Sequence, residues 1–289
     1  MFEFPSVIQI PLAEAVDVVV HWLLIHWAIF FDAISSAVLY VLVNLERFFL
    51  WLPWFVVVGL VGAAAWWSIR RWWGIVLLAG SLIVIGSFGY WEQAMQTLSI
   101  IVVAVIISLA VGIPTGILMA RSDRVESIIR PVLDAMQTMP SFVYLVPALM
   151  FFGLGKVPAV FATVIYAMPP VIRLTNVGIR QVSKDVVEAA RAFGSSWRQV
   201  LLEVQLPLAV PSIMVGINQT TMMALAMVVI ASMIGARGLG LEVLISINRI
   251  EVGRGAEAGL SIVLIAIIID RISHAIASRQ DYTAKTKAS

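Results

Sequence analysis

Residues 173–207 read RLTNVGIRQVSKDVVEAARAFGSSWRQVLLEVQLP, the longest polar stretch of a strongly apolar chain. The pattern predicts two short helices joined by a glycine. Ser183 is suited to begin the first helix as its N-cap, and Gly194 is suited to end it in a left-handed conformation. The serines at 195–196 are suited to begin a second helix, which we expect to end at Pro207. The stretch therefore predicts a rigid helix–glycine–helix elbow, which either docks into a partner protein or lies on the lipid surface.

The composition around this elbow is that of a membrane protein. Of the 289 residues, 61% are hydrophobic and 12% are charged, whereas roughly 25% of the residues of a soluble domain are charged. So few charges cannot cover a soluble surface, which excludes a soluble enzyme, a nucleic-acid-binding protein and a disordered chain. The net charge of +2 implies no polyanionic partner, and the absence of cysteine excludes disulfides and thiolate metal sites.

The hydropathy pattern predicts an all-α polytopic membrane protein. A helix needs about 20 mostly apolar residues to cross the hydrocarbon of a bilayer. Seven segments approach this length, although two of them are short and contain or end at prolines. The predicted spans are residues 50–69, 74–90, 97–120, 141–155, 157–172, 208–234 and 259–277.

Basic residues predict the orientation of these spans. Lys and Arg are enriched in the cytoplasmic loops of membrane proteins. With seven spans and residues 70–71 inside, 14 of the 19 Lys and Arg fall on the inner side. This arrangement predicts an outer N-terminus and a cytoplasmic C-terminus. Acidic residues stand near the start of the chain, and no small-residue cleavage site follows an apolar run, so we expect no signal peptide.

The segment before the first predicted span is amphipathic. Residues 16–31 and 34–49 are apolar but are interrupted by charged and polar side chains, which favours two helices lying on the outer interface. One additional span is the alternative. The predicted organisation is an interfacial scaffold at 1–49, a transmembrane domain at 50–277 that contains the polar loop at 173–207, and a cytoplasmic tail at 278–289.

The elbow carries a family motif. Residues 188–190, Gly194 and residues 204–207 follow the pattern E-A-A-x3-G-x9-I-x-L-P, with Val204 in place of the usual Ile. This spacing resembles the EAA signature of ABC importer permeases. The resemblance implies that the elbow is the coupling helix, seated in a cleft of the ATP-binding subunit. It assigns that contact to Glu188, Ala189, Ala190, Arg191, Phe193, Gly194 and Pro207.

A wider resemblance covers residues 12–278. Over this range the chain is similar to the permeases of glycine betaine/proline osmoprotectant importers, and the expected fold is that of a type-I ABC importer (MetI-like) permease. The implied substrates are glycine betaine, proline betaine or related quaternary ammonium or proline compounds. A permease of the same fold for another small solute, such as an amino acid, is the alternative.

The resemblance also implies the partners in the cell (inner) membrane. One EAA loop serves one ATPase site, so a homodimer with two ATP-binding subunits on the cytoplasmic face is expected. A different permease chain as the second subunit is the alternative. A binding protein is expected to deliver the substrate to the outer face, with transport by alternating access.

The chain shows no catalytic motif of its own. It lacks the G-x4-G-K-[ST] loop that binds nucleotide phosphates, so ATP and Mg²⁺ are expected on the partner ATPase, with no cofactor in this chain. His21, His26 and His274 are scattered, and no metal site is predicted. A secondary transporter is the competing class, but the predicted spans carry almost no charge for ion coupling.

Two polar segments are candidates for lining a transport pathway. Uncharged donors and acceptors suit a zwitterion that must not bind tightly, and methionine adds an adaptable wall. The same side chains also suit helix-to-helix contacts within a dimer. The candidates are Asn218, Gln219, Thr220, Thr221 and Met222, together with Met136, Gln137 and Thr138.

Overall fold

The computed structural model describes residues 12–69 and 72–287, and residues 1–11, 70–71 and 288–289 lie outside the described part. Every regular element in that part is helical. In chain order the elements are α1 (Leu12–His26), α2 (Ala28–Trp51), α3 (Trp54–Ile69), α4 (Trp72–Ser87), α5 (Trp91–Arg121), α6 (Asp123–Thr138), η2 (Ser141–Tyr144), α7 (Leu145–Phe152), α8 (Lys156–Ala167), α9 (Pro169–Arg180), α10 (Lys184–Ala192), α11 (Trp197–Gln199), η3 (Val200–Gln205), α12 (Leu206–Ala231), η4 (Ser232–Ile234), α13 (Leu239–Arg249) and α14 (Val252–Lys287).

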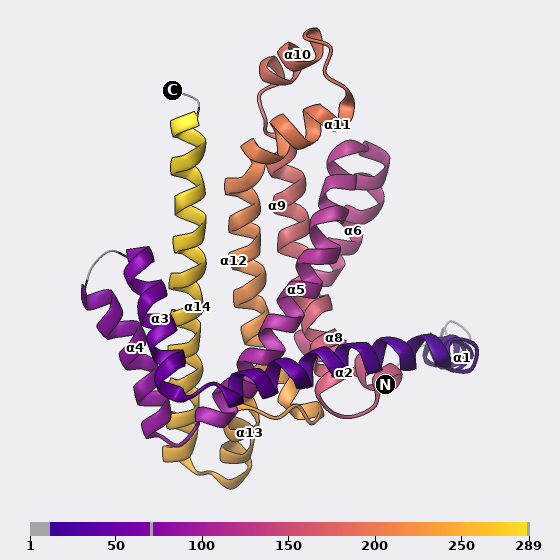
Figure 1. Cartoon of the computed structure of the whole chain (residues 1–289). Coiled ribbons are helices and arrows are strands. Elements are labelled where there is room, and N and C mark those ends of the chain that lie inside the picture. Colours follow the sequence, from indigo (N-terminus) through magenta and orange to yellow (C-terminus); the bar gives the residue numbers. More distant parts are fainter. Residues whose placement is uncertain (1–11, 70–71, 288–289) are drawn as a thin grey trace, which may run out of the picture.

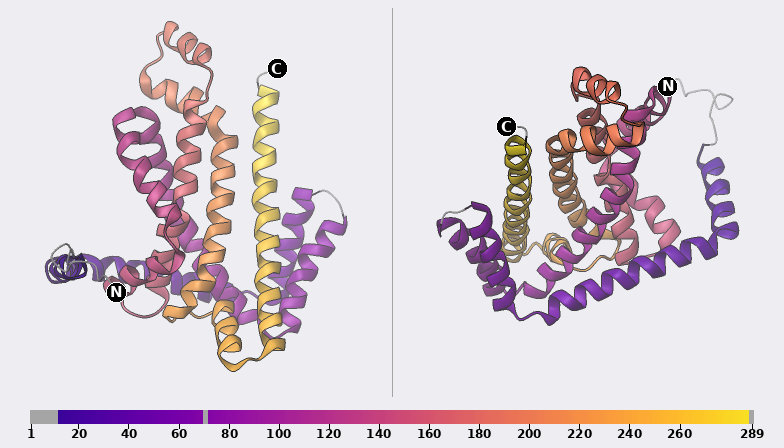
Figure 2. Two further views of the ribbon diagram at one scale, coloured as in Figure 1. Left: turned by 180° about the vertical axis from the view of Figure 1, so that it is seen from behind. Right: turned by 45° about the horizontal axis from the view of Figure 1, so that its top comes forward.

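The long helices share a common direction, and one helix crosses them. In Figure 1, α9, α12 and α14 run along the molecule between α10 at one end and α13 at the other. Helix α2 lies crosswise to α12 and α14, and both views of Figure 2 agree with this arrangement. The C-terminal end of α14 lies at the same end of the molecule as α10.

Glycines let α5, α9 and α12 pack closely in the centre. A Cβ added at Gly116 of α5 would lie 2.6 Å from the Cβ of Thr175 and 2.7 Å from the carbonyl oxygen of Ile172 on α9. A Cβ at Gly178 of α9 would lie 2.7 Å from the Cβ of Ser212 on α12. Small residues at such crossings allow backbones to approach where lipid offers no hydrophobic driving force. These contacts hold the elements on either side of the elbow in one bundle.

The described helices include five that are long and apolar enough to cross a bilayer, or six if the bent pair formed by α6 and residues 141–152 is one span. Helices α3 and α4 are shorter, with 16 residues each. A helix stands at each of the seven predicted positions, but its bounds and geometry differ at several of them. Residues 278–287 of the predicted tail continue α14 as helix, and residues 288–289 are outside the described part.

The predicted span at 141–155 does not form a helix that is long enough to cross the bilayer by itself. Helix α6 and the segment that follows it are bent by 111° at residues 139–140. Met139 is extended because the residue before a proline is pushed out of the helical region. Helix α7 has only eight residues, about 12 Å at 1.5 Å per residue, which is too short to cross the hydrocarbon.

The predicted span at 157–172 does not end at its prolines. Pro169 and Pro170 begin α9, where the missing N–H of proline has no intrahelical partner to lose. Helices α8 and α9 together form a candidate span of 25 residues from Lys156 to Arg180. Residues 173–180 therefore belong to this helix, and the loop predicted at 173–207 begins only after Arg180.

The N-terminal segment forms two helices, but the break lies elsewhere than predicted. The two helices meet at Trp27 instead of residues 32–33, where α2 is continuous. Helix α2 passes the length and apolarity criteria for a span, yet it lies across the other long helices. The Glu46 carboxylate pairs with the Lys156 ammonium at the start of α8, and Phe31 stacks on Phe151 of α7 with ring centroids 4.7 Å apart.

Candidate functional site

The first half of the elbow ends in a Schellman motif. Helix α10 is followed by Gly194 at φ +84°, a left-handed conformation that glycine adopts without steric penalty. The N–H of Gly194 donates to the carbonyl of Arg191 at 2.9 Å, and that of Ser195 donates to the carbonyl of Ala190 at 3.1 Å. These two bonds define the motif and satisfy carbonyls at the helix end. The predicted role of Gly194 as the residue that ends the helix is confirmed.

The second half of the elbow begins with a capping box. The Gln199 N–H donates to Ser196 Oγ at 3.4 Å, and the Ser196 N–H donates to Gln199 Oε1 at 2.8 Å. Ser196 rather than Ser195 is therefore the N-cap. At the other predicted N-cap, Ser183, the side chain makes no capping hydrogen bond to α10.

Pro207 does not end the second helix, which corrects the prediction. Residues Val200–Gln205 form a π-helical turn, and α12 continues directly from it with the proline in its first turn. A π-bulge changes the position of the carbonyls that the proline ring would otherwise meet. The EAA motif therefore ends on the helix that enters the bundle, so the elbow is rigidly connected to α12.

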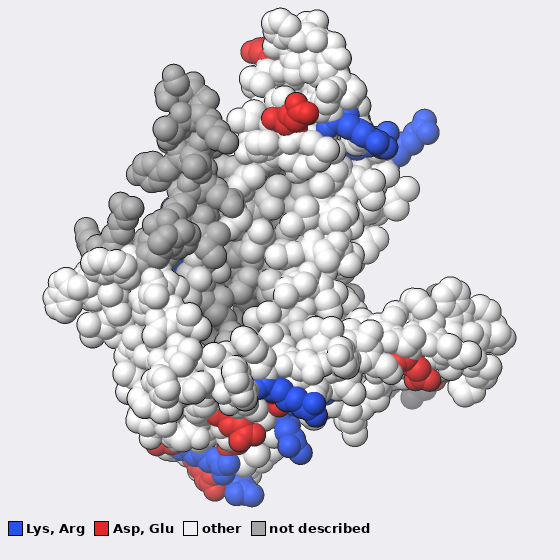
Figure 3. Space-filling view, viewed as in Figure 1, with Lys and Arg blue, Asp and Glu red and all other residues white. Residues whose placement is uncertain are grey.

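The elbow presents small and exposed side chains at one end of the molecule. Glu188 and Ala189 are exposed, Ala190 is half-buried, and Phe193 is 91% exposed at the tip. A helix that carries alanines lets a partner backbone approach closely, and an exposed phenylalanine offers an apolar anchor. Figure 3 shows charged residues gathered mainly at the α10 and α13 ends, with a largely uncharged belt between them.

The elbow also contacts the end of α5. The guanidinium carbon of Arg121 lies 4.2 Å from the ring centroid of Trp197, at the start of the second helix. A guanidinium over an indole face is a favourable cation–π contact.

Below the elbow, α6 and α9 are joined by ion pairs that were not predicted. Arg180 pairs with Asp123 and Glu126, and Arg173 pairs with Asp134. The two arginines entered the sequence prediction only as inner-side positive charges. Their spacing of seven residues in the sequence could have indicated that both arginines lie on one face of a helix, because residues two helical turns apart share a face. Recognising their acidic partners requires knowing that α6 and α9 are neighbours, which hydropathy does not provide.

The polar run on α12 does not present one surface. Successive residues of an α-helix are rotated by about 100°, so four in a row point to four sides. Gln219 is exposed, Thr220 and Thr221 are buried, and the Asn218 amide donates to Asp270 Oδ1 of α14 at 3.4 Å. Met222 borders a cavity between α4, α12 and α14 that also includes Asp270. The side chains thus divide between an outward face and contacts to α14.

The second candidate group occupies the last turn of α6. Gln137 and Thr138 are exposed, and Met136 is half-buried. The Tyr144 hydroxyl donates to the carbonyl of Met136, which ties this turn to η2 beyond the bend. The described chain therefore offers two exposed polar positions here, next to the point where α6 bends.

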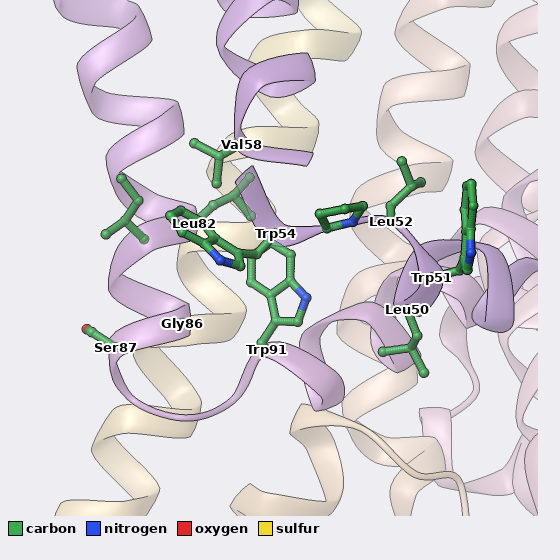
Figure 4. A pocket seen from close by; sticks show the side chains of 11 residues that line it. Leu50, Trp51, Leu52, Trp54, Val58, Leu82, Gly86, Ser87 and Trp91 are labelled. Atoms are coloured by element: carbon green, nitrogen blue, oxygen red, sulfur yellow. The ribbon is translucent and has the colours of Figure 1, made fainter. Parts of the chain in front are cut away.

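Tryptophans gather at the corner between α2 and α3. Trp51, Trp54 and Trp91 border an apolar cavity of about 560 Å³, and Figure 4 shows Trp54 and Trp91 close together there. No charged residue is among the described side chains that line it. The position suits an aromatic interface belt, in which indoles sit at the headgroup level of the bilayer. Among all the described residues, no group of three or more His, Asp or Glu is placed to hold a metal ion.

Comparison with known proteins relates most of this chain to transport permeases. Residues 112–282 match the family described as the binding-protein-dependent transport system inner membrane component. The chain is 47% identical to the glycine betaine/proline betaine transport system permease protein ProW of Escherichia coli (strain K12), over 92% of this chain and 75% of that protein. It is 45% identical to the glycine betaine transport system permease protein OpuAB of Bacillus subtilis (strain 168), over 93% and 95% respectively.

A solved structure shares the fold. The MetNI methionine ABC transporter in an inward-facing conformation contains a chain that matches with a TM-score of 0.58 and 18% identity, over 68% of this chain and 95% of that one. At this identity the likeness concerns the arrangement of the helices alone. It supports the predicted MetI-like fold.

Proposed function

The chain belongs to the family of binding-protein-dependent transport system inner membrane components, and from this premise we propose that it imports glycine betaine, proline betaine or a related quaternary ammonium compound. It acts as the permease subunit of an ATP-driven ABC importer in the inner membrane. The observation that carries the choice of cargo is the 47% identity to a glycine betaine/proline betaine permease over 92% of the chain.

Energy for transport comes from separate ATP-binding subunits. The chain carries an EAA elbow and no phosphate-binding loop. The partner ATPase holds ATP and Mg²⁺ and receives α10 in a surface cleft. Glu188, Ala189 and Ala190 form the docking face, Arg191 and Phe193 lie at its rim, Gly194 sets the turn, and Pro207 stands where the second helix enters the bundle.

Two copies of the chain enclose the pathway at their common axis. Each copy supplies one elbow to one ATPase, and a binding protein delivers the solute to the outer face. The exposed polar positions Gln219 on α12 and Gln137 and Thr138 on α6 support a lining role. The polar contacts of Asn218 and the burial of Thr220 and Thr221 favour packing roles for these three residues.

The chain is oriented with α10 in the cytoplasm. The C-terminal end of α14 lies at the same end as α10 (Figure 1), which supports a cytoplasmic C-terminus. Helices α1 and α2 form a scaffold on the outer interface, supported by the crosswise direction of α2. The N-terminus is outside in this arrangement.

The test is uptake by a reconstituted complex. The permease is placed in liposomes with its ATP-binding subunit inside and its binding protein outside, and labelled glycine betaine uptake is measured with and without internal ATP. ATP-dependent uptake is expected, and unlabelled proline betaine should compete while glycine, which lacks the methyl groups, should not. A complex that hydrolyses ATP but moves only an amino acid would overturn the choice of cargo. Uptake without any ATPase would overturn the ABC assignment.

A further inference from the structure

Arg180 joins three helices through one guanidinium. Its Nη1 lies 2.7 Å from Asp123 Oδ1, and its Nη2 lies 3.0 Å from Glu126 Oε2, both in the first turn of α6. Nη2 also donates to the carbonyl of Met119 at 2.9 Å, near the end of α5. Nε donates to Asn176 Oδ1 at 3.0 Å, one turn back on α9. Every nitrogen of the guanidinium therefore has a partner.

Asn176 is the fourth side chain of this cluster, and it contacts both Arg180 and Glu126. Its amide Nδ2 donates to Glu126 Oε1 at 3.0 Å, so that both oxygens of this carboxylate are held from α9. Asn176 is buried, whereas Asp123 is exposed. The planar fork of arginine fits this set of acceptors, and the single ammonium of lysine cannot reach them all. The junction of α5, α6 and α9 is thus specified by geometry as well as by charge.

A second contact lies lower on the same pair of helices. Arg173 pairs with Asp134, two turns below Arg180 on α9 and near the other end of α6. Because α6 is connected to α9 near each of its ends, a movement of α9 should carry α6 with it. Beyond Thr138 the chain bends by 111°, so the far end of α6 is not continued by a straight helix. This bend is where a rigid α6 would pivot.

The elbow lies directly above this junction. Only three residues, Gln181 to Ser183, separate Arg180 from the start of α10. A displacement of α10 by an ATPase is therefore transmitted to α12 through η3 and, over this three-residue link, to the last turn of α9, where Arg180 sits. The last turn of α6 carries the candidate pathway residues Gln137 and Thr138.

Resting on the proposed function, we propose that Arg180 is the positioning residue that makes α6 move with the coupling elbow. Arg180, Glu126 and Asn176 hold the first turn of α6 against α9, so that the nucleotide state of the ATPase sets the position of Gln137 and Thr138. The Asp134–Arg173 pair keeps the two antiparallel helices side by side during that motion.

A purely stabilising role does not explain the cluster as well. Arg180 is about one-third exposed, and partly exposed ion pairs add little to stability because water screens them. Variants at this position should therefore fold and assemble. The defect of these variants should instead appear in how well ATP hydrolysis is coupled to the movement of α6.

The experiment compares Arg180→Lys with Arg124→Lys in the full reconstituted complex. Arg124 is an exposed arginine on α6, the helix that Arg180 contacts from α9, so it controls for the loss of a guanidinium. Glycine betaine uptake and ATP hydrolysis are measured together as uptake per ATP. In separate samples a spin label is attached to the cysteine introduced by Gln137→Cys. The label can react only at this position of the permease, because the natural chain contains no cysteine. The spectrum of the label is recorded with and without nucleotide.

For Arg180→Lys we expect normal assembly, ATP hydrolysis within about twofold of the wild type, and uptake per ATP reduced by about tenfold, a typical size for a coupling effect between sites. The label at position 137 should respond to nucleotide in the wild type and in Arg124→Lys, and should not respond in Arg180→Lys. Unchanged uptake per ATP together with an unchanged label response would overturn the proposal.

Glu126→Gln provides a second variant that keeps the side-chain size. If both variants fail to assemble, the cluster is structural and the proposal is wrong. If the wild type hydrolyses ATP and its label responds but no betaine enters, the proposed cargo fails while the role of Arg180 is still tested by the label.

Discussion

The backbone N–H of Ser195 donates to the carbonyl oxygen of Ala190 at 3.1 Å, across the left-handed Gly194. This bond sets the direction in which the chain leaves α10. In the proposed complex it therefore also sets how the docking face is presented to the ATPase. The conformation of Gly194 is the element of the elbow that a single substitution tests most directly.

Gly194→Val should weaken binding of the ATP-binding subunit. No atom lies within 4 Å of a Cβ at this position, so the substitution is disfavoured by backbone strain and not by a clash. A left-handed conformation costs an L-residue about 1–2 kcal/mol, which corresponds to roughly a tenfold weaker affinity. The measurement is a titration of ATPase onto the permease in lipid nanodiscs. Gly59→Ala, on α3 with equal space around it, serves as the control, and an equal affinity for both variants would contradict the role of the turn.

Glu188→Lys should separate ATP hydrolysis from transport. The residue is exposed on α10, so the reversal of charge changes the docking face without disturbing the bundle. We expect ATP hydrolysis to persist while uptake per ATP falls by about five- to tenfold, the usual scale of coupling between sites. Glu203→Lys makes the same change on the second helical segment and should keep coupling near the wild-type value. Equal loss in both variants would indicate a general charge effect.

The attachment of α2 to α8 should depend on the Glu46–Lys156 pair. The side chains are 13% and 20% exposed, so each charge is poorly hydrated without the other. Glu46→Gln and Lys156→Gln should each lower the thermal midpoint of the purified permease. The double substitution should lower it by less than the sum, with a coupling energy of about 0.5–3 kcal/mol.

Asp32→Asn, an exposed charge on the same α2 helix, should leave the midpoint unchanged. Additive losses for Glu46 and Lys156 would mean that α2 is held by its apolar contacts alone. In that case the stacking of Phe31 on Phe151 would be the next contact to change.

Local chemistry made the elbow predictable from the sequence, and long-range packing limited the rest. Gly194 and Ser196 act within a few residues of their own positions, so their patterns predict the turn directly. Pro169 and Pro207 were read as helix ends, but both stand in first turns of helices, where proline is tolerated. The cluster around Arg180 joins side chains more than 50 residues apart, and no local pattern pairs them.

Single cysteines should distinguish a pathway surface from a packing surface, because the chain contains no cysteine of its own. Gln219→Cys and Gln137→Cys occupy exposed positions, whereas Thr220→Cys occupies a buried position on the same helix as Gln219. A membrane-impermeant maleimide should label positions 219 and 137 at rates that change with nucleotide, since the proposed alternating access opens the pathway to one side at a time. Position 220 should stay unlabelled in every state. If position 219 faces hydrocarbon instead, its cysteine will also remain unlabelled in every state, because thiolates do not form in lipid. In that case only the exposed residues of α6 would remain as candidates for lining the pathway.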